Sequence, residues 1–202
     1  MTRPDGSEIG ERDEAGAELR RLAGDLKLDR TIALVGLMGA GKTTIGRRLA
    51  HALKLTFVDA DAEIERAAGL SVADIFKLHG EPDFRRGERQ VIARLLKDPP
   101  HVLATGGGAF IDPSTRGEMR ERAITIWLRA PLEVLMRRVE RRDDRPLLKG
   151  GDPQAVMKKL MEDRYPIYAE ADLTIESTNS PHNAAVVAVI EALKARAARM
   201  TQ

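Results

Sequence analysis

The sequence predicts an α/β fold: a three-layer α/β/α sandwich around a five-stranded parallel sheet, with a mobile lid. Two features carry this prediction. Short apolar runs alternate with helical patterns along the chain, and glycine, proline or acidic residues separate them. The first run also leads through a glycine-rich turn into a helix, which is the order expected for parallel strands joined by helices. With 202 residues, the chain is long enough for one domain with a full core.

The first predicted strand lies in the segment TIALVGLMGAGKTT, which begins at Thr31. Its apolar residues 32–35 are typical of a buried parallel strand. The following turn matches the spacing G-x-x-x-x-G-K-[ST] from Gly36 to Thr43. A helical pattern comes next, with apolar residues at i, i+4 and i+8: Ile45, Leu49 and Leu53. Strand, loop and helix therefore occur in the order that a phosphate-binding loop requires.

This loop predicts a site for nucleotide phosphates. Glycines let the backbone wrap around phosphate oxygens, and the positive end of the following helix attracts them. Lys42 is placed to reach the β- and γ-phosphates, and the Thr43 hydroxyl is placed to bind Mg²⁺. We therefore expect the nucleotide to be bound by Gly39, Ala40, Gly41, Lys42, Thr43 and Thr44.

The remaining elements follow in regular alternation. Further strands are predicted at residues 55–59, 101–105, 123–128 and 171–175. Helices are predicted at about residues 61–68, 84–96, 153–168 and 181–198, and others begin at Ser71, Asp112-Pro113 and Pro131. We expect Trp127, in the fourth strand, to lie in the core. The longest candidate mobile loop, and hence the lid, covers about residues 142–152.

Residues 1–28 are predicted to form a charged N-terminal extension, and residues 29–202 the main domain. Leucines and alanines from about Ala15 onward suggest one weakly amphipathic helix. We expect this extension to be frayed or loosely docked, with binding to a partner as the alternative.

Composition excludes several classes of protein. A formal net charge of +2 creates no strong field toward nucleic acid, and no run of about 18 apolar residues predicts a membrane span. The chain has no cysteine, which excludes disulfides and thiolate catalysis and suits a reducing compartment. The four histidines lie far apart without metal-ligand spacing, so a zinc site is not expected. We expect a cytoplasmic monomer that binds neither nucleic acid nor membranes.

The segments after the second and third strands separate the classes of nucleotide-binding protein. Signalling GTPases carry D-x-x-G and N-K-x-D motifs, and motor-type ATPases end the third strand in an acid. Here that strand ends in TGGG, and no N-K-x-D occurs. The acids follow the second strand instead, as Asp59 and Asp61. One can hold Mg²⁺ and the other can accept a hydroxyl proton, although an isolated D-x-D is also typical of a helix cap.

Three arginines are further candidate site residues. Arg85 and Arg164, taken singly, are typical of a solvated surface. Arg145 precedes a proline in the predicted lid, where closure would bring its guanidinium toward a transferring γ-phosphoryl group. The residues alone therefore indicate a small-molecule kinase with a mobile lid.

Taken together, these segments resemble shikimate kinases, a family with the nucleoside monophosphate kinase-like P-loop NTPase fold. The resemblance covers nearly all of residues 31–180, and the order and spacing of its segments make it specific. The matching segments are GLMGAGKTT (36–44), FVDADAEIE (57–65), GEPDFRRGE (80–88), ATGGGA (104–109), RPLL (145–148) and RYPIYAEAD (164–172). The resemblance implies Mg²⁺-dependent transfer of the ATP γ-phosphate to the 3-hydroxyl of shikimate, in the pathway to aromatic amino acids.

The resemblance also implies individual roles. Lys42, Asp61 and Arg145 would be catalytic, with Asp61 orienting or deprotonating the reacting hydroxyl. The shikimate-binding residues would be Asp61, Arg85, Gly107 and Arg164, with the two arginines at the carboxylate. Asp59 and Thr43 would serve the metal. Arg145 would close over the phosphates, and Arg138 would stack on adenine, with the neighbouring Arg137 as the alternative.

Two alternatives remain. A gluconate kinase, or another small P-loop metabolite kinase, would share the phosphate loop but have less use for Arg85, Arg164 and the triple glycine. A nucleotide-binding regulator without catalysis would also keep the loop. The joint presence of Lys42, Thr43, Asp61 and Arg145 disfavours the regulator.

Overall fold

The structure, a computed structural model, describes residues 6–24, 26–140, 152–179 and 182–200, of which residues 6–13 and 200 are described by their backbone alone. Five parallel strands form one sheet in the order β2-β3-β1-β4-β5. This confirms the predicted parallel sheet. The strands are β1 (Thr31–Val35), β2 (Phe57–Asp59), β3 (Val102–Ala104), β4 (Ala123–Arg129) and β5 (Leu173–Glu176).

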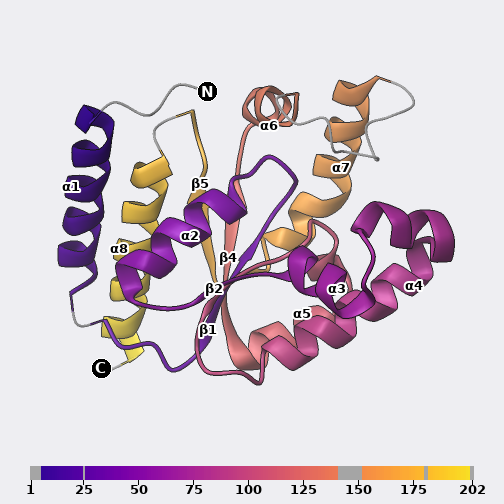
Figure 1. Cartoon of the computed structure of the whole chain (residues 1–202), viewed down its shortest axis with the longest axis horizontal. Helices are drawn as coiled ribbons and strands as arrows, with labels where there is room; N and C mark the ends of the chain where they lie inside the picture. The colour runs from indigo at the N-terminus through magenta and orange to yellow at the C-terminus, as the bar shows by residue number, and fades with distance from the viewer. Residues whose placement is uncertain (1–5, 25, 141–151, 180–181, 201–202) are drawn as a thin grey trace.

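Helices cover both faces of the sheet, so the predicted three layers are present. Figure 1 shows α1, α2 and α8 on one side and α4, α5 and α7 on the other. The central strand β1 is buried at all five positions because it has a neighbour on each side and helices on both faces. The helices are α1 (Gly6–Ala23), α2 (Lys42–Leu53), α3 (Ala60–Ala68), α4 (Val72–Leu95), the 3₁₀ turn η1 (Ala109–Ile111), α5 (Pro113–Arg122), α6 (Leu132–Val139), α7 (Pro153–Tyr168) and α8 (His182–Met200).

Capping residues that were recognisable in the sequence mark the starts of several helices. The side chain of Ser71 accepts a hydrogen bond from the Asp74 amide at the start of α4, and Asp112 caps α5 in the same way. The predicted break between a helix after Ser71 and one from residue 84 is present as a kink within α4. At that kink Gly80 has φ 79° and ψ 173°. Trp127 is 4% exposed, which confirms its place in the core.

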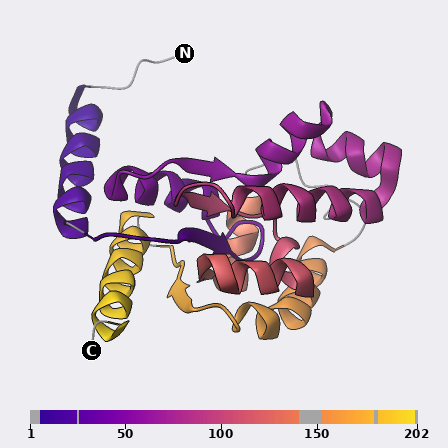
Figure 2. The same ribbon diagram turned by 90° about the horizontal axis from the view of Figure 1, so that it is seen from below.

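The N-terminal helix differs from its prediction. α1 begins at Gly6 rather than near Ala15, and it packs against α2 and α8 (Figure 2). Leu19 and Ala23 are 5% and 2% exposed, so the expectation of a loosely docked extension was wrong for this part of it. The pattern was hard to recognise because these two positions, four residues apart, make a narrow apolar stripe on a strongly charged helix.

The predicted lid lies almost entirely outside the described residues, which omit 141–151. Arg145 therefore has no described position. Asp152, at the end of the predicted lid, caps α7 by accepting a hydrogen bond from the Gln154 amide. Among the described residues, no helix is both long and apolar enough to cross a bilayer.

Candidate active site

The order of the strands brings the candidate segments together at one edge of the sheet. In parallel strands all carboxyl ends lie at the same edge, and ligands of open α/β sheets bind there. Ala104 of β3 pairs with Leu34 of β1 on one side and with Asp59 of β2 on the other. The phosphate loop after β1, the glycines after β3 and the acids after β2 therefore leave the sheet side by side.

The phosphate loop adopts a conformation that requires glycine at two positions. Gly36 has φ 133°, and a Cβ there would lie 2.8 Å from the carbonyl oxygen of Leu128. Gly41 has φ 98° and precedes α2, whose first turn receives no side-chain cap. Gly41 has no side chain to cover the amide N–H groups at the start of α2, which suits an anion site there.

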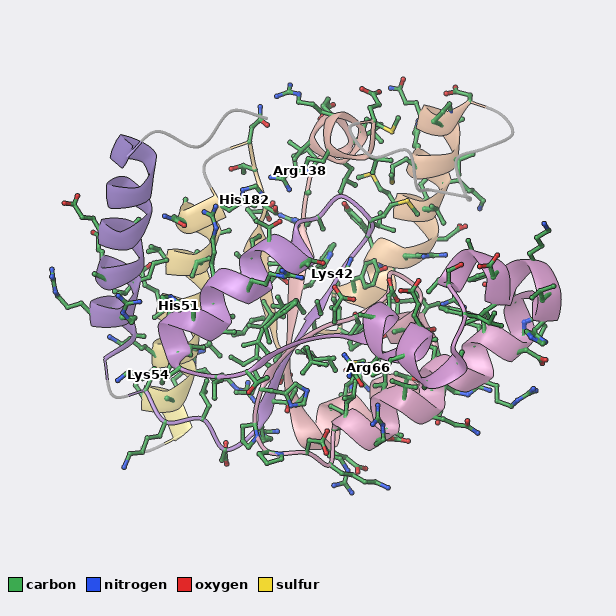
Figure 3. The ribbon with its side chains drawn as sticks, in the orientation of Figure 1. Lys42, His51, Lys54, Arg66, Arg138 and His182 are labelled. Carbon is green, nitrogen blue, oxygen red and sulfur yellow. The ribbon has the colours of Figure 1, made fainter. Side chains whose placement is uncertain are left out.

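Lys42 and Thr43 form the first polar contacts of α2. Lys42 lies beside the loop that leaves β1 (Figure 3), and its Nζ donates hydrogen bonds to the carbonyls of Gly36 at 2.8 Å and Leu37 at 3.0 Å. The Thr43 hydroxyl donates to Asp59 Oδ2 at 3.0 Å. Asp59 also accepts a hydrogen bond from the Asp61 amide at 3.2 Å and so caps α3. Asp59 therefore serves as the helix cap as well as lying against Thr43.

The pair of Thr43 and Asp59 suits a magnesium ion. Both supply oxygen, the donor that Mg²⁺ prefers, and Mg²⁺ in nucleotide sites keeps several water and phosphate ligands. Among the described residues, no group of three or more histidines, cysteines and acids could form an all-protein metal cage. The donor set therefore fits a metal held mainly by a nucleotide.

Asp61 lies beside the triple glycine that follows β3. A Cβ on Gly106 would be 3.0 Å from Asp61 Oδ1 and 2.7 Å from Glu88 Oε1. Two carboxylates thus approach one glycine, which has room for them because it lacks a side chain. Asp61 is exposed, whereas Glu88 is 2% exposed.

Arg85 of α4 is held by two acids on its own helix. Its Nη1 donates to Glu88 Oε2 at 2.7 Å, and its Nη2 donates to Glu81 Oε1 at 3.1 Å. The Arg85 side chain is 23% exposed, so its interpretation as a solvated surface residue was wrong. Burial raises the pKa of Glu88 above its usual value, and the nearby Asp61 adds to this effect, while Arg85 opposes it.

Arg164 reaches the same glycines from α7. Its Nη1 donates to the Gly107 carbonyl at 3.1 Å, and its side chain is partly buried, so it too is no simple surface residue. A Cβ on Gly108 would collide with the guanidinium of Arg85. Two guanidinium groups therefore approach one short loop, which is an arrangement suited to binding a carboxylate.

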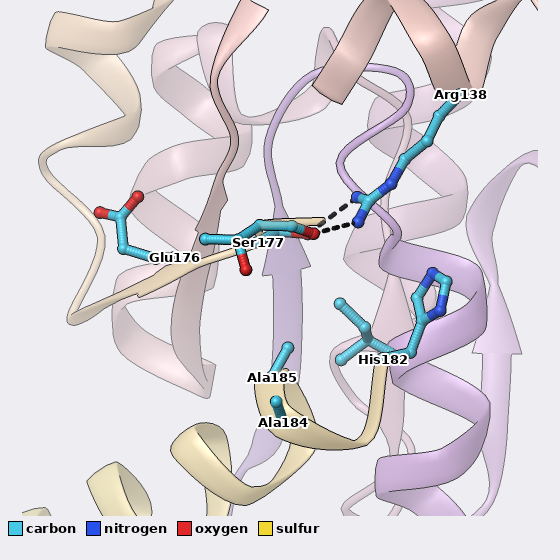
Figure 4. Close-up of a pocket in the computed structure, with 8 residues that line it drawn as sticks. Arg138, Glu176, Ser177, His182, Ala184 and Ala185 are labelled. Atoms are coloured by element: carbon cyan, nitrogen blue, oxygen red, sulfur yellow. Dashed lines mark hydrogen bonds between the residues drawn. The ribbon is translucent and has the colours of Figure 1, made fainter. Parts of the chain in front are cut away.

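A pocket lies beside the phosphate loop, between α2, α6, the segment that follows β5 and the start of α8 (Figure 4). Arg138 lines it, and its guanidinium donates to the carbonyls of Gly39 at 3.1 Å and Ala40 at 3.3 Å. The same group donates to Ser177 Oγ at 2.9 Å and to the Thr178 carbonyl at 2.6 Å. Arg137 is exposed instead. Burial lowers the pKa of His182 in this pocket, and the charges of Arg138 and Arg48 lower it further.

The structure adds site residues that the sequence interpretation missed. Glu88 holds Arg85, Tyr168 donates to the Gly107 carbonyl, and Ser177 donates to the Ala40 carbonyl at 2.7 Å. Only Glu88 had a sequence signal, because it follows Arg85 by three residues on one helix face.

Comparisons with known proteins agree with this geometry. Residues 38–194 match the shikimate kinase family. Over 178 residues the chain is 57% identical to a shikimate kinase of Paramagnetospirillum magneticum, an alignment that covers 87% of this chain and 91% of the relative. It is 56% identical over 165 residues to a shikimate kinase of Caulobacter vibrioides, with 82% of each chain covered.

Solved structures give the same result. The shikimate kinase of Acinetobacter baumannii in complex with shikimate superimposes with a TM-score of 0.82 at 36% identity, covering 86% of this chain and 98% of that one. A gluconokinase of Sinorhizobium meliloti has a TM-score of 0.59 at 18% identity, with 87% of this chain and 99% of that one covered. The second likeness extends to the fold alone.

Proposed function

The chain belongs to the shikimate kinase family and uses ATP to phosphorylate the 3-hydroxyl of shikimate, and we propose that the residues gathered at the carboxyl edge of the sheet carry out this reaction. One observation carries the assignment of residues. Asp61, Arg85, Arg164 and the triple glycine come from four separate segments, yet their contacts converge beside the phosphate loop. This convergence supplies an anion clamp and a hydroxyl acceptor next to the phosphates.

Arg85 and Arg164 bind the carboxylate of shikimate. Guanidinium groups match carboxylate geometry and keep their charge at any relevant pH. Gly107 lets the backbone approach the ring closely, because no side chain stands between that backbone and Arg164. Asp61 then accepts a hydrogen bond from the 3-hydroxyl and orients or deprotonates it for attack.

ATP is bound at the phosphate loop by residues 39–44, which include Lys42. Lys42 donates to two loop carbonyls in this structure, and we propose that its ammonium shifts to the β- and γ-phosphates when nucleotide binds. The pocket beside Arg138 receives the adenine. The hydrogen bonds of Arg138 use the edge of its guanidinium, which leaves the flat face for stacking.

Thr43 and Asp59 would hold Mg²⁺, which when bound neutralises charge on the phosphates. Arg145, outside the described residues, is proposed to close over the phosphates with the lid of residues 142–152, because the sequence around it resembles that of the family. Phosphoryl transfer depends mainly on positioning and charge neutralisation, so Lys42, Asp61 and Arg145 form the proposed catalytic set.

We also propose that residues 29–202 act as a monomeric kinase domain in the cytoplasm. The absence of cysteine from the sequence suits a reducing compartment such as the cytoplasm.

A direct assay tests the function. ADP release is coupled to a dehydrogenase readout, with shikimate and gluconate as parallel acceptors in the presence of ATP and Mg²⁺. We expect turnover with shikimate and none above background with gluconate. Turnover with gluconate alone would overturn the proposed acceptor site while leaving the fold unaffected.

A further inference from the structure

Tyr168, the last residue of α7, is a buried aromatic residue with one polar atom to satisfy. Its side chain is fully buried, and its ring centroid lies 6.5 Å from that of Phe110 and 6.0 Å from that of Trp127. The ring is therefore fixed by packing on two sides. A buried tyrosine hydroxyl needs a hydrogen-bond partner, and here that partner is the carbonyl of Gly107.

The Gly107 carbonyl accepts two hydrogen bonds from the same helix. Arg164 Nη1 donates to it at 3.1 Å, and the Tyr168 hydroxyl is the second donor. A carbonyl oxygen has two lone pairs, so these donors complete its capacity. Arg164 and Tyr168 stand four residues apart on α7, which places their side chains on one face of the helix. The end of α7 is thus joined to the triple glycine through one atom.

We propose that Tyr168 is a positioning residue for the substrate carboxylate, which it serves by fixing the Gly107 carbonyl that in turn orients the guanidinium of Arg164. This inference rests on the proposed function, in which Arg164 binds that carboxylate. One N–H of Arg164 is committed to Gly107, and the remaining N–H groups serve the substrate. The carbonyl keeps Arg164 in place only while the carbonyl itself is held. Tyr168 is the rigid support, since its ring cannot move within the packed core.

The protonation state of the hydroxyl agrees with this role. Burial raises the pKa of Tyr168 to about 12, an effect that the charge of Arg164, its hydrogen bond to the tyrosine and the charge of Arg85 oppose only in part. The hydroxyl therefore keeps its proton throughout the neutral range. It donates to the carbonyl at any pH suitable for an assay, whereas a phenolate could not donate.

The experiment compares two tyrosines of α7. Tyr168→Phe removes the hydroxyl and keeps the ring between Phe110 and Trp127. Tyr165→Phe is the matched control, because its hydroxyl also donates to a backbone carbonyl, that of Ala130 at 2.6 Å, which lies outside the triple glycine. The Kd of shikimate is measured by calorimetry, the KM values for shikimate and ATP by steady-state kinetics, and the melting temperature by circular dichroism.

Tyr168→Phe should raise the Kd and KM for shikimate about threefold to tenfold, the cost of one lost hydrogen bond that leaves a buried acceptor under-satisfied. The KM for ATP should stay within about twofold. Tyr165→Phe should leave all three constants within about twofold. A Tyr168→Phe variant with unchanged shikimate affinity, or one that weakens ATP and shikimate equally, would overturn the inference.

The variant Arg164→Ala distinguishes a failure of this inference from a failure of the proposed function on which it rests. If Arg164→Ala weakens shikimate binding more than tenfold while Tyr168→Phe changes it by less than about twofold, the carboxylate site stands and the role of Tyr168 is refuted. If Arg164→Ala leaves shikimate binding unchanged, the proposed carboxylate site is wrong, and the role of Tyr168 is refuted with it.

Discussion

Replacing Gly106 by alanine probes the contact between the two carboxylates and the triple glycine. Gly106 does not have a positive φ, so alanine is compatible with its backbone. The new methyl carbon would lie 2.7 Å from Glu88 Oε1 and 3.0 Å from Asp61 Oδ1. The first distance is shorter than real side chains show, so at least one group must move.

The structure indicates which group moves and by how much. Glu88 must retreat by about 0.7 Å to reach an ordinary contact of 3.4 Å. It is 2% exposed, and its other oxygen is held by Arg85 at 2.7 Å, so Arg85 has to move with it. Overpacking of this kind costs about 1–3 kcal/mol of stability. A shift near 1 Å in groups that hold substrate costs about 100-fold in rate.

We therefore expect Gly106→Ala to lower kcat/KM for shikimate by about 100-fold and the melting temperature by roughly 2–12 °C. The KM for ATP should stay within about twofold, since the three atoms nearest to the new methyl belong to Glu88 and Asp61 and not to the phosphate loop. Gly87→Ala is the control: it precedes Glu88 on α4, and a Cβ there meets no atom within 4 Å. A folded Gly106→Ala enzyme with shikimate kinetics equal to those of Gly87→Ala would refute this reasoning.

Four further predictions test other parts of the molecule. Asp61→Asn should keep its ATP affinity, measured by calorimetry, and lose about 100-fold or more in kcat, because an amide cannot accept the proton; a kcat within tenfold of wild type would contradict that role. Arg85→Ala should raise the KM for shikimate at least about tenfold and the KM for ATP little, and equal effects on both substrates would count against the carboxylate clamp. Burial raises the pKa of Glu88 in the folded protein above its ordinary 4.5. The protonated carboxyl group therefore stabilises the fold fully below pH 4.5, and this stabilisation is lost as the pH rises through the pKa of the folded state. The melting temperature of wild type should therefore fall relative to that of Glu88→Gln as pH rises above 4.5, and parallel melting curves would exclude this coupling. Leu19→Ala should cost about 2–3 kcal/mol in denaturant unfolding, since Leu19 is 5% exposed, whereas a cost below about 0.5 kcal/mol would mean that α1 is not docked in solution.

Features that depend on neighbouring residues in the chain could be predicted from sequence. The phosphate loop is one continuous segment, so strand, glycines and Lys42 were recognisable together. Helix starts at Ser71 and Asp112 followed from caps that act across three residues. The alternation of apolar runs with helical patterns similarly predicted the parallel sheet, because both periodicities are local.

Features that depend on distant segments were decided by the tertiary structure. Whether Arg85 and Arg164 lie at a surface or a site depends on the strand order, which places β3 between β2 and β1. The burial of Leu19 depends on α2 and α8, and the hydroxyl of Tyr168 finds its hydrogen-bond acceptor 61 residues away. The side chain of a residue determines which chemistry it can perform. Its burial and its contact partners are determined by chain segments that meet only when the sheet forms. For this protein the sequence determined the chemistry available, and the fold determined which groups meet.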